Sequence, residues 1–457
     1  MHFIGIAGAG MSALAELLAR RGVRVQGTDA NPEGAPDLLR LGIAVTAHDA
    51  SRVASARAIV YSSAIPSAHP EMQAARAAGL PLVRRAEALA AAVSGGTLVG
   101  IAGTHGKTTT TVMTTEALAA AGLAPTGVVG GRVERWQGNL HLGGPTYVVE
   151  ADEYDRSFLA LSVDVAVVLN VEADHLDIYR DLDDISRTFE QYCSPARVLV
   201  RCADDDGAMQ LRVASSREVI AYSATAPGSE PAPHARDARL VADALVLDAA
   251  GSRFTVRFDG EALGDVQLAV PGVHNVRNAL AALGAGLALG AKVPDMAVGL
   301  AAFRGVERRF QRLGAAAGVE VVDDYAHHPT EVAATLAAAR HSFPGRRLVL
   351  AFQPHLYSRT RDLQREFAEA LSAADALFLC DIYGAREAPE PGVSSALIAQ
   401  RVTGDVLRWS GPRSDVAAAL AGFVREGDVV LTMGAGDITR SGPELLARLG
   451  GSPPQSH

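Results

Sequence analysis

A short glycine-rich segment, 103–110, carries the residue types best suited to chemistry. It reads GTHGKTTT, it follows the apolar run 97–102, and it precedes the helical run 112–118. A glycine-rich turn between a strand and a helix directs backbone N–H groups at phosphate oxygens, while a lysine reaches the terminal phosphates and a threonine hydroxyl binds Mg²⁺. We therefore predict a phosphate-binding loop that uses Lys107 and Thr108 in these two roles.

The spacing of this loop is shorter than the common G-x-x-x-x-G-K-[ST] pattern, because Ile101 stands where the first glycine would be. The lysine itself sharpens the prediction. Lysines and arginines together number 42, and the only lysines are Lys107 and Lys292. In so arginine-rich a chain, a lysine here favours a slender point charge over a planar guanidinium. The alternative is an ordinary turn with an incidental lysine.

Acidic residues follow the next two predicted strands. The strand 147–149 ends in Glu150, and the strand 165–169 leads to Asp174 and His175. Because the carboxyl ends of parallel strands meet at one edge of a sheet, we expect these side chains beside the phosphates, where carboxylates bind Mg²⁺. A solvated acidic loop is the alternative for the segment around His175.

The chain opens on a second glycine-rich turn. Gly8 and Gly10 follow a strand that starts at His2, and Asp29 follows the strand 23–28. Small residues at such a turn let a backbone approach a pyrophosphate, and an acid after the second strand commonly contacts a ribose. This domain lacks a full second half, so we expect one nucleotide-linked ligand and no hydride cofactor. The alternative is a Rossmann-like domain kept for packing. Two further strands are predicted at 43–46 and 58–61.

Two amides mark the end of the central region. Alternating apolar residues between 240 and 270 predict antiparallel strands, and Asn275 and Asn278 then precede the predicted helix 279–289. Paired amides can read an adenine edge by donor and acceptor, although an asparagine at a helix start is also an ordinary cap.

Beyond a junction at 303–310, strands and helices alternate as in a second doubly wound α/β unit. Two segments carry histidine beside an acid or an arginine at a predicted strand end: 323–329, with Asp324 and His327, and 353–359, with His355 and Arg359. The alternative for either segment is a structural role. The predicted strands are 319–322, 347–352, 376–380, 406–409 and 429–433, and the predicted helices are 330–340 and 362–371.

Composition limits the classes of function. The 457-residue chain is 48% hydrophobic and 20% charged, which is ordinary for a globular protein of several domains. Its net charge of −9 argues against general nucleic-acid binding. No apolar run is long enough for a membrane span and no basic-then-apolar leader opens the chain, so neither a span nor a signal peptide is expected. Three cysteines, Cys193, Cys202 and Cys380, form no CxxC pair, so we expect a cytoplasmic location and no structural zinc.

Taken in order, these motifs resemble those of the Mur ligase family, ATP-dependent enzymes that form amides in peptidoglycan precursor synthesis. The resembling segments are GTHGKTT at 103–109, EADE at 150–153, DH at 174–175, PxxHNxxN at 271–278, GVxxRF at 305–310 and DYAH at 324–327, which span nearly the whole chain. The resemblance implies an α/β fold of three domains. These are a Rossmann-like UDP-sugar-binding domain at 1–94, a central P-loop ATPase-type domain with added antiparallel strands at 97–304 that binds ATP, and a Rossmann-like amino-acid-binding domain at 308–457.

Within the family, three segments resemble the branch that joins L-alanine to UDP-N-acetylmuramate. They are the N-terminal GxxGxGMS turn, DDYAHHPTE at 323–331 and FQPHxYSRT at 352–360. The resemblance then implies transfer of the ATP γ-phosphate to the lactyl carboxylate and attack by alanine on the acyl phosphate. Several later-acting members carry a carbamylated lysine in the middle domain. This chain has no lysine between Lys107 and Lys292, which fits the alanine-adding branch.

Three other functions stay open. A ligase that reattaches a recycled tripeptide, L-Ala-γ-D-Glu-meso-diaminopimelate, to the same sugar shares the N-terminal turn and the EADEYD stretch but should differ at 352–360. A P-loop kinase or motor-type ATPase would explain residues 97–180 and leave both flanking domains idle. A non-catalytic UDP-sugar-binding regulator would need a damaged loop, yet Lys107, Glu150 and His175 are all present.

The resemblance assigns roles residue by residue. The expected catalytic residues are Lys107, His327, His355 and Arg359, with Arg359 on the alanine carboxylate and one histidine as the base. The expected ligands of Mg²⁺ are Thr108, Glu150 and His175. The residues expected to bind ATP are Gly103, Thr104, His105, Gly106, Lys107, Thr108, Thr109, His274, Asn275, Asn278, Arg309 and Asp324. Those expected to bind the UDP-sugar are Gly8, Ala9, Gly10, Met11, Ser12, Asp29, Ser62 and Ser63. We expect no nucleic-acid partner, and a monomer or weak homodimer.

Overall fold

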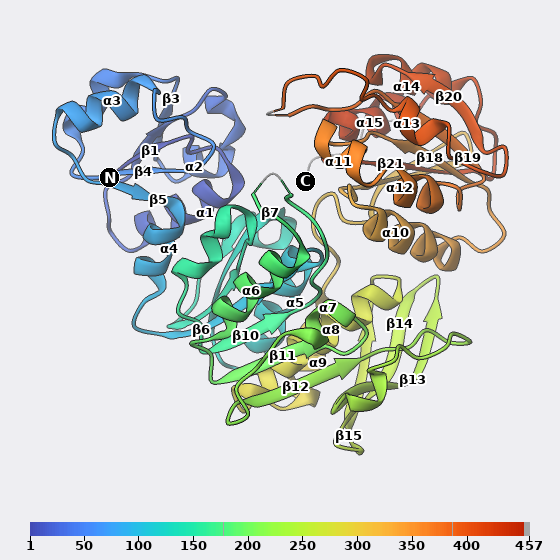
Figure 1. The fold of residues 1–457 in the computed structure, drawn as a ribbon, viewed down its shortest axis with the longest axis horizontal. Coiled ribbons are helices and arrows are strands. Elements are labelled where there is room, and N and C mark those ends of the chain that lie inside the picture. The colour runs from blue at the N-terminus through green and yellow to red at the C-terminus, as the bar shows by residue number, and fades with distance from the viewer. Residues whose placement is uncertain (177, 386, 452–457) are drawn as a thin grey trace. The chain divides into compact units, whose positions relative to one another are not determined.

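Three separate sheets organise the chain, as the computed structural model in Figure 1 shows. The structure describes residues 1–176, 178–385 and 387–451, so the end of the predicted third domain, 452–457, lies outside it. The chain divides into two compact units. One comprises Met1–Leu245, Phe254–Gln267 and Val276–Val306, and the other comprises Val246–Arg253, Leu268–Asn275 and Glu307–His457. Each sheet contains parallel strands connected by helices, which confirms the predicted three-domain α/β class.

The first sheet has five parallel strands in the order β3-β2-β1-β4-β5. Successive residues of a strand point to opposite faces, so Phe3 packs in the cluster that contains Leu14 of α1, and Ile4 packs in the cluster that contains Met72 of α3. The predicted glycine-rich turn connects β1 to α1. The strands are β1 (His2–Ile4), β2 (Gln26–Thr28), β3 (Ala44–Thr46), β4 (Ile59–Tyr61) and β5 (Leu82–Arg84), and the helices are α1 (Ala9–Arg20), α2 (Pro36–Arg40), α3 (Pro70–Ala77) and α4 (Arg85–Val93).

The second sheet has ten strands in the order β15-β14-β13-β12-β11-β10-β6-β9-β7-β8. The pairs that β6 forms with β9 and β10 are parallel, and β6 is almost entirely buried because it lies in the middle of the sheet. At the edge, β8 runs antiparallel to β7. The strands are β6 (Thr97–Ala102), β7 (Pro125–Val133), β8 (Gly138–His141), β9 (Thr146–Glu150), β10 (Val165–Val168), β11 (Val198–Cys202), β12 (Glu218–Ser223), β13 (Leu240–Asp248), β14 (Gly251–Phe258) and β15 (Glu261–Leu268). The helices are α5 (Lys107–Ala120), α6 (Leu182–Cys193), α7 (Asp206–Gln210), α8 (Val273–Ala288) and α9 (Val293–Ala302).

The third sheet has six strands in the order β16-β17-β21-β18-β19-β20. Only the edge pair β16 and β17 is antiparallel among the described pairs of this sheet. Separate apolar clusters cover its two faces, one with Val322 and Leu350 and the other with Val321 and Val349. The strands are β16 (Gln311–Ala316), β17 (Val319–Asp324), β18 (Leu348–Phe352), β19 (Ala376–Cys380), β20 (Leu407–Gly411) and β21 (Val429–Met433). The helices are α10 (Pro329–Ser342), α11 (Tyr357–Asp362), α12 (Gln364–Leu371), α13 (Ala396–Ala399), α14 (Arg413–Ala421) and α15 (Ser441–Arg448).

Several boundaries differ from those predicted. Three helices begin earlier than the sequence indicated. Helix α1 begins at Ala9, where the sequence predicts a helix at 14–20, α5 begins at Lys107 and not at 112, and α8 begins at Val273 and not at 279. The predicted helix 362–371 corresponds to α12, and the unpredicted helix α11 precedes it, so Arg359 lies on a helix and not in a loop. Strands β5, β7, β8, β11, β12 and β16 were not predicted. The glycine-containing β7 shows why, since its sequence PTGVVGGRV has a weak strand signal.

Within the described residues, no helix combines the length and apolar character that crossing a membrane requires.

Candidate active site

The glycine-rich segment after β6 forms a tight turn that starts α5. Gly103 and Gly106 have φ of +147° and +80°, a region that side-chain-bearing residues rarely adopt, and Gly106 caps α5. The helix begins at Lys107, so the first-turn N–H groups belong to the Lys-Thr part of the motif. Three of the threonines that follow donate their hydroxyls to the carbonyl four residues back, as Thr111 does to Lys107 at 2.8 Å. This geometry presents backbone donors and the positive end of a helix dipole to an anion.

Lys107 is mostly buried, with a side chain 14% exposed, and is held by three oxygens. Its Nζ donates to Oε1 of Glu153 at 2.8 Å and to the carbonyls of Gly103 and Thr104 at 2.7 and 3.2 Å. Burial alone would lower the pKa of Lys107, but the carboxylates of Glu153 and Asp152 outweigh it and raise that pKa above its usual value. Burial raises the pKa of Glu153 in turn. Lys107 therefore stays cationic, and Glu153 is a charged neighbour that the sequence did not single out.

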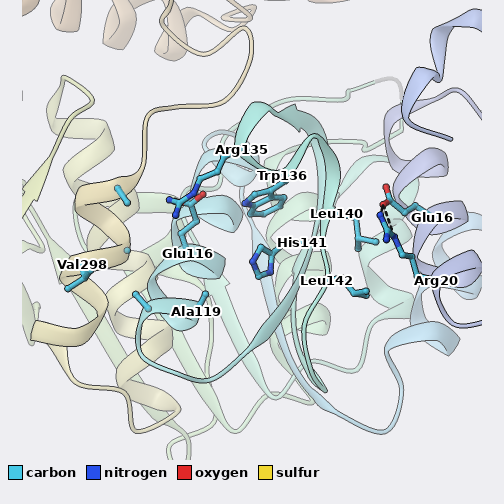
Figure 2. Close-up of a pocket in the computed structure, with 13 residues that line it drawn as sticks. Glu16, Arg20, Glu116, Ala119, Arg135, Trp136, Leu140, His141, Leu142 and Val298 are labelled. Atoms are coloured by element: carbon cyan, nitrogen blue, oxygen red, sulfur yellow. Dashed lines mark hydrogen bonds and ion pairs between the residues drawn. The ribbon is translucent and has the colours of Figure 1, made fainter. Parts of the chain in front are cut away.

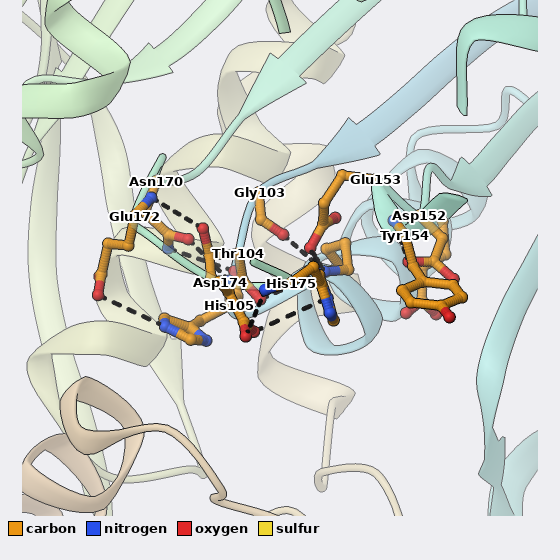
Figure 3. A network of polar contacts seen from close by, with 12 residues as sticks. Gly103, Thr104, His105, Asp152, Glu153, Tyr154, Asn170, Glu172, Asp174 and His175 are labelled. Carbon is orange, nitrogen blue, oxygen red and sulfur yellow. Dashed lines mark hydrogen bonds and ion pairs between the residues drawn. The ribbon is translucent and has the colours of Figure 1, made fainter. Parts of the chain in front are cut away.

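Thr108 and Glu150 lie together, as expected for two ligands of one metal ion. The Thr108 hydroxyl donates to Oε1 of Glu150 at 2.9 Å, and the N–H of Gly130 donates to Oε2 at 2.6 Å. A hydroxyl and a carboxylate are hard oxygen donors of the kind that Mg²⁺ binds, so these residues fit that ion. The third expected ligand, His175, lies beside other acids. Its Nε2 is 3.7 Å from Oε1 of Glu153 and 3.7 Å from Oδ2 of Asp174 (Figure 3).

The segment after β10 is fastened to the phosphate-binding loop, as Figure 3 shows. Oδ1 of Asn170 accepts the N–H of His105 at 2.7 Å, and the N–H of Glu172 donates to the Thr104 hydroxyl at 2.9 Å. His105 also lies 3.7 Å from a carboxylate oxygen of Glu172. These contacts fix the loop from the side of the neighbouring strand. Only the three-dimensional pairing of β6 with β10 shows this, because no sequence pattern joins the two segments.

Helix α8 brings Asn278 against the same loop. A Cβ placed on Gly106 would lie 2.9 Å from Oδ1 of Asn278. Helix α8 begins at Val273, so the residues predicted to bind adenine lie inside a helix and not before one. Asn275 donates from Nδ2 to the carbonyl of Pro271 at 2.7 Å, so its side chain is a donor here and not an N-terminal cap. His274 lies one residue earlier in the same helical turn.

Two of the residues predicted to bind the UDP-sugar line a small cavity beside the N-terminal turn. Oδ2 and Oδ1 of Asp29 accept the N–H groups of Ala7 and Asn31, each at 2.9 Å, so Asp29 fixes the turn. A cavity of about 280 Å³ is lined by Ala9 and Ser12 from the predicted set. Its other lining residues are Ala7, Ala13, Glu16, Gly34, Ala35, Pro36, Asp37, Leu38, Arg132 and Asn139. The other residues predicted to bind the UDP-sugar do not line this cavity: Gly8, Gly10, Met11, Asp29, Ser62 and Ser63.

A larger cavity of about 540 Å³ lies along the C-terminal half of α5 (Figure 2). Glu116 from α5 is paired there with Arg135 at 3.3 Å, and Glu16 of α1 with Arg20 at 3.1 Å, so the charges in its wall are balanced. The ring of Trp136 is tilted against that of His141 at 5.4 Å. None of the predicted site residues lines this cavity.

In the other unit, Asp324 ends β17 as a buried acid. Its Oδ2 and Oδ1 accept the N–H groups of Phe310 and Ala326, each at 2.7 Å. Burial raises the pKa of this carboxyl to about 6, against the opposing effect of Arg309. Arg309 itself lies over the ring of Tyr325 at 5.0 Å. The predicted Arg309 and Asp324 are therefore neighbours.

Three further predicted residues gather at the carboxyl ends of β17 and β18. The rings of His327 and His355 are 6.0 Å apart, and Nη1 of Arg359 is 3.4 Å from Nδ1 of His355. His327 is oriented by the carbonyl of Tyr325 at 3.0 Å and by Oε2 of Glu331 at 3.2 Å. Two imidazoles beside a guanidinium suit a small zwitterion, whose carboxylate the guanidinium can bind and whose ammonium proton an imidazole can accept.

Comparison with known proteins covers nearly the whole chain. Three family models match: the Mur ligase family catalytic domain at residues 1–97, the Mur ligase middle domain at 101–286, and the Mur ligase glutamate ligase domain at 308–436. The UDP-N-acetylmuramate–L-alanine ligase of Streptomyces avermitilis is 44% identical over 98% of this chain and 97% of its own length.

Solved structures agree. The UDP-N-acetylmuramate-alanine ligase MurC of Thermotoga maritima is 26% identical, with a TM-score of 0.81 and 98% of both chains covered. A murein peptide ligase of Psychrobacter arcticus, 23% identical with a TM-score of 0.71 and the same coverage, shares the fold. With the phosphate-binding loop, the buried acids and all three family models arranged along one sequence, the chain belongs to the Mur ligase family.

Proposed function

We propose that this chain is an ATP-dependent ligase that joins L-alanine to the lactyl carboxylate of UDP-N-acetylmuramate, a step of peptidoglycan precursor synthesis. One observation carries the proposal: the chain is 44% identical, over 98% of its length, to a protein named for that reaction. The geometry of Lys107, Glu150 and the phosphate-binding loop supports the use of ATP.

The chemistry starts from a poor electrophile, since a carboxylate ion resists attack by an amine. One lactyl carboxylate oxygen attacks the γ-phosphorus of ATP, the bond to the bridging oxygen breaks, and ADP leaves. The alanine amine then attacks the acyl carbon of the acyl phosphate, inorganic phosphate leaves, and the ammonium proton passes to a base. The protein mainly positions the reactants and offsets crowded negative charge.

Lys107 and the N–H groups at the start of α5 are proposed to hold the β- and γ-phosphates. In this structure Nζ of Lys107 donates to Oε1 of Glu153 at 2.8 Å, so a bound phosphate would replace the Glu153 carboxylate as the anionic partner of Lys107. Thr108 and Glu150 are proposed ligands of Mg²⁺, which would neutralise phosphate charge when bound. His175, with Glu150, is proposed for a second ion. Asn278 lies against the loop at Gly106, which supports a role in adenine binding shared with His274 and Asn275.

The three domains are proposed to divide the substrates. Residues 1–94 bind the UDP-sugar, and the cavity of about 280 Å³ beside Ala9 and Ser12 supports this. Residues 97–304 bind ATP. Residues 308–457 bind L-alanine through His327, His355 and Arg359, with Arg359 on the carboxylate, and contribute Arg309 and Asp324 to ATP. Since the residues come from separate domains, we propose that domain closure precedes chemistry.

We also propose a cellular location and an oligomeric state for the chain. The three cysteines are free and buried, which suits the reducing cytoplasm where we place the reaction. We propose a monomer or weak homodimer, which sedimentation velocity at several concentrations would measure.

Product analysis tests the proposed function. The full-length chain is incubated with UDP-N-acetylmuramate, ATP, Mg²⁺ and L-alanine, and the products are separated and weighed by mass spectrometry. The expected product is the UDP-sugar enlarged by one alanine less one water, with ADP and phosphate in equal amounts. The choice of amino acid would be overturned if the UDP-sugar stayed unchanged in the presence of alanine but gave a larger product when the tripeptide L-Ala-γ-D-Glu-meso-diaminopimelate was supplied.

A further inference from the structure

A cluster of three histidines and one glutamate lies on the first sheet and includes no residue assigned above to a substrate. Its centre is Glu71, in the first turn of α3, whose side chain is 1% exposed. The carboxylate accepts hydrogen bonds from the Thr28 hydroxyl at 2.7 Å, from Nε2 of His2 at 2.9 Å and from the N–H of Asp49 at 2.9 Å. Burial raises the pKa of this carboxyl, but these hydrogen bonds outweigh burial and lower it to about 2. Glu71 is therefore a fixed anion at neutral pH.

Two imidazoles stand next to this anion. Nδ1 of His48 is 3.1 Å from Oε1 of Glu71, and the rings of His48 and His69 meet edge to face at 4.6 Å. One donor atom from each of His48, His69 and Glu71 lies within 4.8 Å of the other two. The His48 side chain is one-third exposed (33%), so the cluster opens to solvent on that side. An ion from solution can thus reach it without displacing the core.

Two imidazole nitrogens and one carboxylate oxygen form the donor set of zinc sites that keep a fourth position for water. With bonds of about 2.0–2.1 Å in a tetrahedral arrangement, neighbouring donors stand about 3.3 Å apart. The 3.1 Å between His48 and Glu71 is already close to that spacing. Histidine and carboxylate together favour Zn²⁺ over Mg²⁺, which prefers six oxygens.

We infer that His48, His69 and Glu71 form a binding site for Zn²⁺, with water in the remaining position. His2 and the Thr28 hydroxyl orient the carboxylate from behind, as outer partners of metal ligands commonly do. The site uses no cysteine, so the absence of a CxxC pair said nothing about it.

The site is joined to the N-terminal glycine-rich turn through one residue. Thr28 bonds to Glu71 by its hydroxyl, and its carbonyl accepts the N–H groups of Gly5 and Ile6 at 2.8 and 3.1 Å. Zinc that fixes Glu71 also fixes the end of β2 against that turn. A ligand that binds the folded chain and not the unfolded chain stabilises the folded state by mass action, so bound zinc raises the melting temperature of the protein.

The test is a zinc titration of the full-length chain after removal of metals with a chelator. Zn²⁺ is added against a chromophoric competitor, with Mg²⁺ in excess to occupy oxygen-rich sites. The wild type is expected to hold one equivalent with a Kd on the order of micromolar or tighter. His69→Asn keeps a side-chain oxygen for the N-cap that His69 Nδ1 now provides to the N–H of Glu71. It removes the imidazole and is expected to weaken that equivalent by about tenfold or more.

A second variant and a matched control complete the design. His48→Gln retains a donor for Glu71, removes the second imidazole, and is expected to weaken zinc similarly. The control is His234→Ala, because His234 also stands between carboxylates, 3.5 Å from Asp237 and 3.9 Å from Asp206, away from the site. It should bind zinc as the wild type does. The inference is overturned if the wild type holds no zinc under these conditions. It is equally overturned if His69→Asn and His48→Gln keep the wild-type affinity and the zinc-dependent rise in melting temperature.

Discussion

Replacing Gly106 by alanine probes whether the phosphate-binding loop and α8 form one nucleotide site. Gly106 caps α5 with φ of +80°. A side-chain-bearing residue there loses about 1–2 kcal/mol to strain, and the restricted unfolded chain returns about 0.4–1 kcal/mol. The net loss in the free energy of unfolding is therefore about 1 kcal/mol.

The new Cβ also meets two neighbours. It would lie 2.9 Å from Oδ1 of Asn278 and 3.3 Å from Cδ1 of Leu169, so the Asn278 amide must move. If that amide holds adenine, Gly106→Ala loses one hydrogen bond worth about 0.5–1.5 kcal/mol. ATP binding should then weaken about two- to tenfold.

Gly122→Ala is the matched control, since Gly122 follows the other end of α5, has the same φ of +80°, and has no heavy atom within 4 Å of the new Cβ. Denaturant unfolding should show a loss of about 1 kcal/mol for Gly122→Ala and a loss at least as large for Gly106→Ala, whose Cβ also displaces the Asn278 amide. Calorimetry with a non-hydrolysable ATP analogue should show weaker binding for Gly106→Ala alone. Wild-type affinity in Gly106→Ala would refute the shared site, and an equal loss in Gly122→Ala would attribute the effect to strain.

Three other substitutions test separate parts of the site. Lys107→Ala should abolish ADP formation in a phosphate-release assay while calorimetry still detects binding of UDP-N-acetylmuramate, because Lys107 begins a helix that follows the second sheet and the N-terminal turn belongs to the first. Loss of both would contradict separable domains. Arg359→Ala should raise the KM for L-alanine about 10- to 100-fold, the value of charge-assisted hydrogen bonds, and the KM for ATP far less; equal rises would argue against the carboxylate assignment. Burial raises the pKa of Asp324 from 3.8 to about 6, so its contribution to stability is present below about pH 4 and is lost as the pH rises through 6. The free energy of unfolding of the wild type should therefore fall by about 3 kcal/mol more between pH 4 and 7 than that of Asp324→Asn, as denaturant unfolding of both proteins at each pH would measure. The same pH dependence in both proteins would mean that Asp324 does not titrate in this range.

The central parallel strands could be predicted from the sequence because both of their faces are buried. Strands 97–102, 376–380 and 429–433 were predicted with the observed ends, since each is a mostly apolar run. The start of α5 could not, because four successive threonines after Lys107 have low helix propensity and only the capped turn makes them helical. Strand β7 could not be predicted either, because its glycines weaken the strand signal.

Some residues of the candidate site could likewise be predicted from the sequence, and others could not. Lys107, Thr108 and Glu150 could be found because they stand next to strand ends in a known type of motif. Glu153 could not be selected over its acidic neighbours, because its pairing with Lys107 depends on how two strands of one sheet align. The cluster of His48, His69 and Glu71 lacks any recognisable spacing, and only the fold brings these residues together.

The most direct measurement of the proposed function is phosphate release from ATP in the presence of UDP-N-acetylmuramate and Mg²⁺, with a single amino component added at a time. L-alanine alone should start release, and the tripeptide L-Ala-γ-D-Glu-meso-diaminopimelate should not. Release that needs the tripeptide and ignores L-alanine would contradict the proposed reaction, and the segment 352–360 with His355 and Arg359 would then serve a larger substrate.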